Sequence, residues 1–298
     1  MPRELLPGQR AELLIIDVDS ATVALRHATD TLLIEAPNWS PDGQALIVNG
    51  AGRLFVLGVE TGGPDEIDLG GLAGINNDHV LSPDGRTVYV SSDDGHIYAV
   101  ALDGSGHPRR VSNDNGEGFR HYLHGVSPDG RMLAYIGVES AGGTVRANVW
   151  LLPSAGGADI QLTNDRFPDD GAEFSPDGRW VYFNSERASA TPGHAQLFRM
   201  PVPPAPQAGP EQLTFDERVN WFPHLSPDGT RIAYVSFPPG TVGHPGNVEV
   251  LVRLLEADGT IRDLARVRGG QGTMNVPSWD PTGRKIAIVA YPLDAPPR

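Results

Sequence analysis

A twelve-residue pattern recurs along the 298-residue chain and constrains its fold more than any other feature. Each copy carries Ser-Pro-Asp-Gly between an apolar residue and an alternating apolar run, as in FSPDGRWVYFNS from Phe174. A sixth, altered copy reads WDPTGRKIAIVA. The first motif residues stand at positions 40, 82, 127, 175, 226 and 280, so the spacing grows from 42 to 54 residues. A period of this length is the size of one four-stranded β-propeller blade.

The motif itself predicts a strand, a tight turn and a second strand. Proline presets the first turn angle, aspartate accepts a hydrogen bond from the backbone just ahead of it, and glycine takes the positive φ that closes the turn. Third and fourth strands follow, the fourth as in DIQLT (159–163) and EQLTF (211–215). The 36 Gly and 27 Pro residues are spread along the chain, which favours many turns over a disordered segment. The sequence therefore predicts an all-β, six-bladed propeller.

The two ends of the chain are predicted to share the last blade. The sixth motif is followed by too few residues for four strands, whereas two apolar segments, 11–18 and 22–28, precede the first motif. We expect these N-terminal strands to pair with C-terminal strands in 276–291. Such closure protects the edges that an open array would expose. Residues 1–298 would then form a single domain.

Composition excludes several kinds of function. The chain has no cysteine, so disulfides, thiolate metal sites and a cysteine nucleophile are excluded. Its formal net charge of −14, with no run of Lys and Arg, argues against a nucleic-acid partner. The longest N-terminal apolar run, residues 13–16, is too short for a signal peptide or a membrane span. We expect a cytoplasmic monomer that does not bind membranes.

The six motifs, the EAPNWSPDG lead-in and the predicted clasp together resemble the TolB-like six-bladed β-propeller family, over essentially the whole chain. The resemblance implies the fold. It also implies one possible role, a non-catalytic scaffold whose face binds a protein or peptide partner.

Long loops and histidines gather on one predicted face, the top face, opposite the motif turns. The long loops span 138–145, 185–194 and 236–247. His79 and His124 both stand three residues before the motif serine, where the innermost strand enters beside the central channel. Loops at one end of a rigid scaffold are where binding usually occurs. The top-face channel mouth is therefore the predicted ligand site.

Other polar and aromatic residues lie on the same chain crossings. A concave mouth with convergent carboxylate, amide and aromatic groups suits a small polar ligand of carbohydrate or uronide type. The candidate ligand-binding residues are Asn77, Asp78, Tyr122, Asp170, Glu173, Trp221, Asn275 and Arg120.

The chain is also similar, more distantly, to the oligogalacturonate lyase propellers, which have similar Ser-Pro-Asp-Gly blades. That resemblance implies one divalent ion (Mn, Zn or Ca) at the channel mouth and metal-assisted lyase or hydrolase chemistry. The implied metal ligands are His79, His124, His224 and Gln271, and the implied base is His121 or His244. Gln271 is followed by GTMNVPS, which contains no histidine.

Three functions remain open at this point. The first is an enzyme that acts on a sugar-like molecule, and the second is the protein- or peptide-binding scaffold. The third is a sugar sensor, which would use the same site and bind without turnover.

Overall fold

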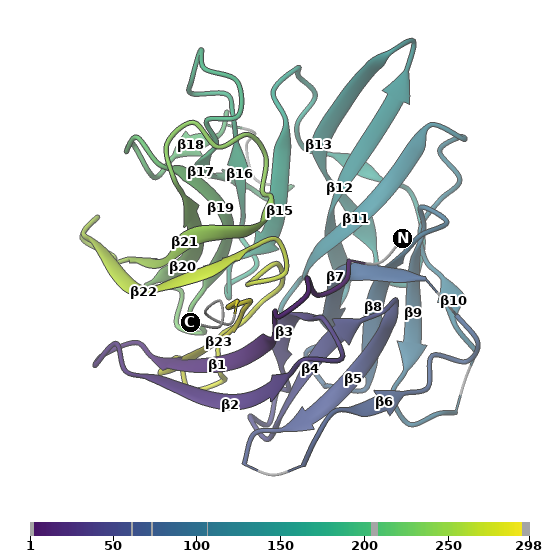
Figure 1. Ribbon diagram of the computed structural model, residues 1–298. Helices are drawn as coiled ribbons and strands as arrows, with labels where there is room; N and C mark the ends of the chain where they lie inside the picture. The colour runs from purple at the N-terminus through teal and green to yellow at the C-terminus, as the bar shows by residue number, and fades with distance from the viewer. Residues whose placement is uncertain (1–2, 61, 73, 106, 204–207, 294–298) are drawn as a thin grey trace.

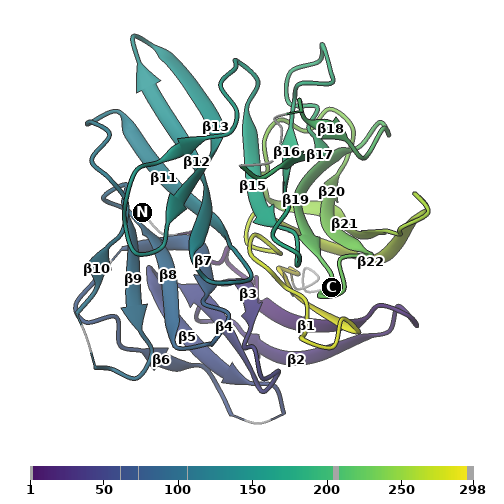
Figure 2. The ribbon, with the colours of Figure 1, turned by 180° about the vertical axis from the view of Figure 1, so that it is seen from behind.

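The computed structural model describes residues 3–60, 62–72, 74–105, 107–203 and 208–293, and its strands form six antiparallel sheets arranged in a ring (Figure 1). Figure 2 shows the ring from behind. None of the described residues belongs to a helix long and apolar enough to cross a membrane. The predicted all-β, six-bladed propeller is confirmed. Residues 1–2 and 294–298 of the predicted domain lie outside the described residues.

The first five blades have four strands each, arranged in chain order from the innermost strand outward. Blade one contains β3 (Ile34–Trp39), β4 (Ala45–Gly50), β5 (Arg53–Gly58) and β6 (Asp65–Ile67). Blade two contains β7 (Ile75–Leu81), β8 (Thr87–Ser92), β9 (Ile97–Ala101) and β10 (Arg109–Arg110). Blade three contains β11 (Phe119–Val126), β12 (Met132–Ala141), β13 (Thr144–Pro153) and β14 (Ile160–Gln161). Blade four contains β15 (Asp169–Phe174), β16 (Trp180–Ser185), β17 (Gln196–Pro201) and β18 (Glu211–Gln212). Blade five contains β19 (Val219–Leu225), β20 (Ile232–Phe237), β21 (Gly246–Leu255) and β22 (Ile261–Gly270).

The repeated motif forms the same turn between the first two strands of these blades. In blade three, the Ser127 hydroxyl donates to Oδ1 of Asp129 at 2.6 Å and accepts from the backbone N–H of Met132 at 2.9 Å. Gly130 has a φ of 72°, a conformation that glycine adopts without a Cβ clash. Each residue type of the motif thus has a defined role in the turn.

The sixth copy makes the same turn with different atoms. Thr282 Oγ1 donates to a carboxylate oxygen of Asp280, and the other oxygen accepts from the backbone N–H groups of Arg284 and Lys285 at 2.8 and 2.7 Å. Asp280 therefore replaces the motif serine as the central acceptor.

The motif turns pack against one another around the ring. A Cβ added to Gly85 would lie 3.2 Å from Pro41, so the proline of one motif covers the glycine of the next. The same contact repeats as Pro83–Gly130, Pro128–Gly178, Pro176–Gly229, Pro227–Gly283 and Pro281–Gly43. The last pair joins the sixth motif to the first, which closes the ring.

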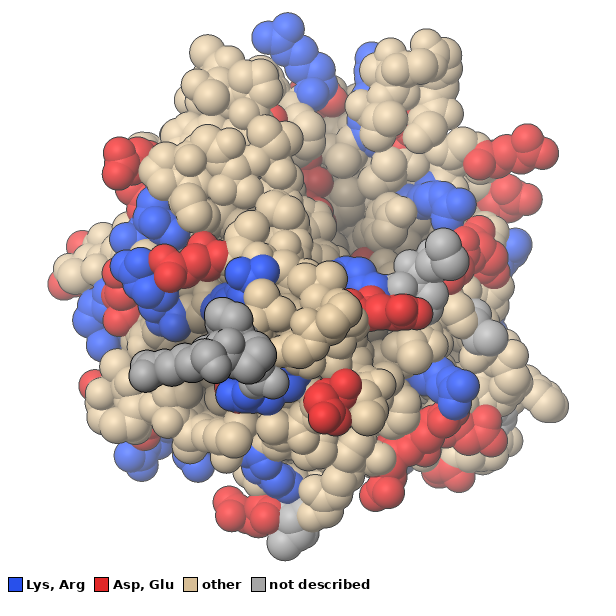
Figure 3. Space-filling model, viewed as in Figure 1, with Lys and Arg blue, Asp and Glu red and all other residues tan. Residues whose placement is uncertain are grey.

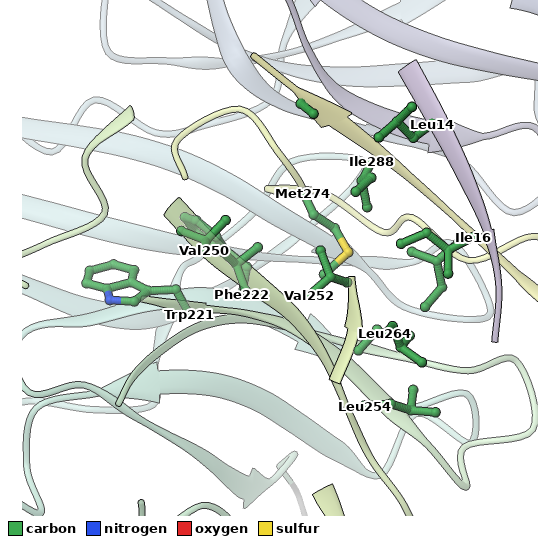
Figure 4. Packing of buried hydrophobic residues seen from close by; sticks show 14 of the residues in the cluster. Leu14, Ile16, Trp221, Phe222, Val250, Val252, Leu254, Leu264, Met274 and Ile288 are labelled. Atoms are coloured by element: carbon green, nitrogen blue, oxygen red, sulfur yellow. The ribbon is translucent and has the colours of Figure 1, made fainter. Parts of the chain in front are cut away.

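The sixth blade is built from both ends of the chain. β1 (Ala11–Asp17) pairs with β23 (Lys285–Ala290), and β2 (Val23–Thr29) pairs with the outer edge of β1. Leu14 of β1 and Ile288 of β23 share one buried cluster (Figure 4). The predicted clasp is confirmed.

One part of the predicted clasp is less regular than expected. The expected innermost strand before the sixth turn does not form among the described residues, where Trp279 makes an isolated bridge to Ile286. The sheet of the sixth blade therefore has three strands instead of four.

The innermost strands share an irregularity just before the motif. In the five complete blades, pairing between the first and second strands shifts register here, which is a β-bulge. In β19 the shift lies between Trp221 and His224, and Phe222 takes a φ of 58°. The Phe222 N–H donates to Oδ1 of Asn184 in the preceding blade at 3.0 Å. Contacts between blades therefore help to fix where the inner side chains point.

The expected loop at 138–145 is mostly strand. β12 continues to Ala141 and β13 begins at Thr144, so only Gly142 and Gly143 form the turn. Both glycines have positive φ, 58° and 78°, which suits a two-residue hairpin turn. The hairpin consequently extends above its blade, whereas 185–194 and 236–247 contain the expected irregular connections.

Candidate functional site

A cavity of about 320 Å³ lies at the top-face end of the channel, and we call it the main cavity. In Figure 3 the surface is hollowed in the upper middle, between the regions that carry β12–β13 and β15–β16 in Figure 1. The lining residues are Asn76, Asn77, Asp78, Tyr122, His124, Ile136, Val138, Ala147, Asp169, Asp170, Phe222, His244, Gln271 and Asn275. They come from blades two to five and from the segment that leads into the sixth motif.

The centre of the main cavity is a carboxylate between two imidazoles. His124 Nε2 lies 2.8 Å from Oδ1 of Asp170, and His244 Nε2 lies 3.5 Å from Oδ2. The other ring nitrogen of His124 lies 3.3 Å from the Asn275 carbonyl oxygen, and that of His244 contacts the side-chain oxygen of Gln271. Carbonyl and carboxylate oxygens only accept, so both nitrogens of each ring act as donors. This geometry favours charged imidazolium rings beside an ionised Asp170.

The proton equilibria of these groups follow from burial and charge. Burial by itself would lower the pKa of His124, but the carboxylates of Asp78 and Asp170 outweigh it and raise the pKa to about 9. Burial would raise the pKa of Asp170, yet hydrogen bonds and charge from both histidines lower it well below its usual range. The pKa of His244 is raised, because its contacts with Asp170 outweigh burial.

Asp78 differs from Asp170 because it lacks a direct imidazole partner. Burial raises the pKa of Asp78 to about 6, with the charge of His124 opposing the rise. One carboxylate oxygen accepts from the Asn76 side chain at 2.6 Å. Asp78 is therefore a carboxyl group of the main cavity that can exchange a proton near neutral pH. Burial raises the pKa of Asp169 to about 6 as well, although Arg187 holds that carboxylate in an ion pair.

A second ion pair supports the strand that carries Asp170. Arg187 Nη2 lies 2.8 and 2.9 Å from the two carboxylate oxygens of the adjacent Asp169. The guanidinium also lies over the Phe183 ring at 5.4 Å. Asp169 is buried and fixed by this contact, which helps to hold the entry of β15 in place.

The structure brings together only part of the predicted site. The predicted residues that line the main cavity are Asn77, Asp78, Tyr122, Asp170, Asn275, His124, His244 and Gln271. They come from separate chain crossings, as expected for a channel mouth.

Six of the predicted residues lie outside the main cavity, among them His121, Arg120 and Trp221. His121 donates to the Gly95 carbonyl at 2.8 Å, and its ring packs against Phe119. Arg120 donates to the Asp93 carbonyl at 2.9 Å. Trp221 is buried behind His244, with ring centroids 4.5 Å apart.

The implied metal ligands do not converge. His79 Nε2 lies 3.3 Å from the Ile47 carbonyl oxygen, and burial lowers the pKa of His79 to about 4. His224 lies 2.6 Å from Glu173 and 3.1 Å from the Met274 carbonyl oxygen, whereas His124 faces the main cavity. In the described part of the chain, no group of three or more His, Asp or Glu residues could hold a metal ion. The residues implied by the lyase resemblance thus do not fit a divalent-ion site.

Glu173, a candidate ligand-binding residue, and His224, an implied metal ligand, meet in a contact between blades four and five. Glu173, His224 and Asn38 all stand two residues before their motif serine. Glu173 accepts from the Leu225 N–H at 3.0 Å, and Asn38 accepts from the Leu81 N–H at 3.1 Å, so each joins its strand to the next blade. The repeated polar residue at this position was a signal for an inter-blade contact.

No protein-family model matches the sequence. The chain is 36% identical over 264 residues to an uncharacterized protein of Agrobacterium fabrum, which covers 87% of this chain and 85% of that protein. A solved TolB-like protein of Agrobacterium tumefaciens is 34% identical with a TM-score of 0.85, covering 95% of this chain and 98% of that one.

A more distant structure shares the fold alone. An oligogalacturonate lyase in complex with manganese is 14% identical with a TM-score of 0.59, covering 90% of this chain and 74% of the lyase. Because this similarity is low in sequence, the classification rests on the closer relatives and on the six-bladed ring. The chain belongs to the TolB-like six-bladed β-propeller family.

Proposed function

We propose that the protein binds a small, hydroxyl-rich ligand of carbohydrate type in the main cavity. The observation that carries this proposal is the convergence of Asp78, His124, Asp170 and His244 with several amide side chains around one cavity. Carboxylate, imidazole and amide groups donate to and accept from neighbouring hydroxyls.

The size and lining of the main cavity support a small ligand. Its volume of about 320 Å³ is at the low end of the roughly 300–1,000 Å³ typical of small-molecule sites. Tyr122 adds aromatic surface beside the polar groups. A single sugar unit suits this space better than a long polymer.

The proposal also allows acid–base chemistry by the chain's own residues. Asp78 and the His124–Asp170 pair differ in how tightly they hold protons, which is the arrangement that general acid and base groups need. A lyase or hydrolase activity would use these groups, and we assign no step to a metal because the implied ligand set does not fit one.

The alternative is a protein- or peptide-binding scaffold, which the TolB-like relationship favours. Its support on the surface is the exposure of Val145, in the β12–β13 hairpin, and of Val242, between β20 and β21, at 65% and 72%. Trp221 and Phe222, the aromatic residues of β19, are 6% and 1% exposed and do not form an exposed aromatic patch. We therefore place this function second.

The first prediction concerns ligand binding. Isothermal titration with neutral monosaccharides, disaccharides and galacturonates should reveal a saturable ligand. Asp170→Asn should weaken binding of that ligand about tenfold or more, since it removes the charge that orders both imidazoles. The control Asp263→Asn changes a half-exposed carboxylate paired with Arg253, outside the main cavity, and should leave the affinity unchanged.

Three outcomes are informative. Saturable sugar binding that fails in Asp170→Asn supports the proposal, and release of reducing ends from the bound sugar would add an enzymatic activity. Absence of binding by every sugar and galacturonate would overturn it and leave the scaffold function.

A further inference from the structure

A smaller cavity of about 140 Å³ adjoins the main cavity, and we call it the side pocket. It lies between blades one and two. Three residues line both spaces: Asn76, Asn77 and Gln271. Its wall also includes Arg3, Glu35, Asn49 and Asp93. The N-terminal segment therefore helps to build the candidate site.

Arg3 is held firmly against this wall. Its guanidinium pairs with the buried Glu35 carboxylate and donates to the Gln271 carbonyl oxygen at 2.5 Å. It also lies 5.3 Å from the centre of the Tyr291 ring. These contacts tie the N-terminal segment to Gln271, whose side chain contacts His244 in the main cavity.

Three polar atoms of the side-pocket residues have no hydrogen-bond partner among the described residues. They are Oδ1 of Asn49, Nδ2 of Asn77 and Nη2 of Arg3. Asn49 and Asn77 are 3% and 6% exposed, so bulk water does not readily reach their side chains to act as a hydrogen-bond partner. Buried polar groups in folded proteins are normally paired, which makes this cluster a candidate for ligand recognition.

The chemistry of these atoms selects the kind of group that would pair with them. Asn49 offers an acceptor and Asn77 offers a donor, whereas Nη2 of Arg3 lies against Gly246, outside the side pocket. A hydroxyl both donates and accepts, so hydroxyl groups can satisfy both the Asn49 and the Asn77 atom. A carboxylate only accepts and would leave the Asn49 oxygen unpaired.

Charge also disfavours an anionic group. Two carboxylates, Glu35 and Asp93, line the side pocket with one guanidinium, that of Arg3. In the main cavity, Asp78 and Asp170 offset the two imidazoles. An added carboxylate would meet no net positive charge in either space.

We infer that the side pocket is a second subsite, which binds a hydroxyl-bearing unit of a neutral saccharide whose neighbouring unit occupies the main cavity. This inference rests on the proposed function and deepens it. The ligand is then a neutral disaccharide or longer saccharide, and uronides are excluded.

The test compares Asn49→Leu with the wild type by isothermal titration and thermal unfolding. The probes are glucose, galactose, maltose, cellobiose, lactose, galacturonate and digalacturonate. In the wild type, a neutral disaccharide should bind at least fivefold more tightly than its monosaccharide and than digalacturonate. Asn49→Leu should remove this advantage and leave monosaccharide affinity unchanged.

Thermal unfolding separates a binding role from a structural one. Asn49→Leu removes an unpaired buried acceptor together with the 3.5 Å contact from Asn49 Nδ2 to Oε2 of Glu35, so it should lower the Tm by less than the control variant does. The control is Asn148→Leu, since Asn148 is 1% exposed, lies outside both spaces and accepts from the Asp165 N–H. That variant should lower the Tm and keep the disaccharide advantage.

The outcomes distinguish the subsite from the proposed function. If neutral sugars bind but Asn49→Leu retains the disaccharide advantage, or if digalacturonate binds best, the subsite is wrong and the sugar site stands. If none of the probes binds the wild type, the proposed function itself is overturned.

Discussion

Buried charges at the channel mouth cost desolvation energy that their mutual contacts offset. His124 is 3% exposed and contacts Asp170 directly, with Asp78 nearby. Removing one member of such a buried pair leaves the other charge without its partner, which is strongly destabilising. These residues contribute to stability as well as to the proposed site.

The pH dependence of stability should reveal the His124 contact. Its folded pKa of about 9 exceeds the ordinary 6.5, so its contribution is complete below about 6.5 and is lost as the pH rises through about 9. The difference corresponds to about 3 kcal/mol. Urea unfolding of wild type and His124→Gln should therefore give stabilities that approach each other between about pH 6.5 and about pH 9.

The exposed His107 provides the control. His107→Gln should follow the wild-type stability profile across this range. Parallel profiles for wild type and His124→Gln would refute the charged His124 contact.

At the scale of one element, the motif turn is a small hydrogen-bond network. In the described blades the serine hydroxyl links the aspartate to the start of the second strand, as Ser127 does between Asp129 and Met132. The sixth motif keeps the turn with Asp280 and Thr282 in exchanged roles. The sixth motif is therefore a natural variant that forms the same turn as the Ser-Pro-Asp-Gly copies.

This alternative gives a matched test. Ser127→Ala should lower the unfolding free energy by about 1–3 kcal/mol, because the Met132 N–H and Asp129 lose a partner. Ser127→Asp combined with Asp129→Thr recreates the sixth motif and should recover most of the loss. Urea denaturation measures both, and a double variant no more stable than Ser127→Ala would contradict the equivalence of the two motifs.

At the scale of the whole molecule, stability depends on closing the ring. The Pro281–Gly43 contact joins the last motif turn to the first, and the β1–β23 ladder joins the two ends of the chain. Figure 4 shows Leu14 and Ile16 on the same side as Ile288, packed among residues of blade five. The clasp is thus part of the hydrophobic core between blades.

Shortening a buried side chain of the clasp should lower the stability of the whole propeller. Ile16 is fully buried, so Ile16→Ala should lower the unfolding free energy by about 2–5 kcal/mol. Ile160→Ala, at a residue 39% exposed on the outer strand of blade three, should change it by about 0.5 kcal/mol or less. Equal effects in thermal unfolding would show that β1 is not integral to the fold.

Cytoplasmic location and the monomeric state stay predictions.

About half of the candidate site was predictable from sequence. Polar residues on chain crossings, among them Asp78, Asp170 and Asn275, were expected at the channel mouth and line the main cavity. His121 and His79 carried the same sequence signal, yet their rings contact backbone carbonyls outside it. Arg3 and Asn49 had no local pattern that linked them to the site.

The sequence by itself determined the number of blades, their turns and the clasp. These features depend on local turn chemistry and on strand periodicity, which nearby residues specify. Only the tertiary structure decided which histidines face the main cavity. A bulge reverses the direction of the side chains along a strand, and the partners that fix it come from another blade, as Asn184 does for Phe222. The site therefore depends on contacts between distant residues that no local pattern encodes.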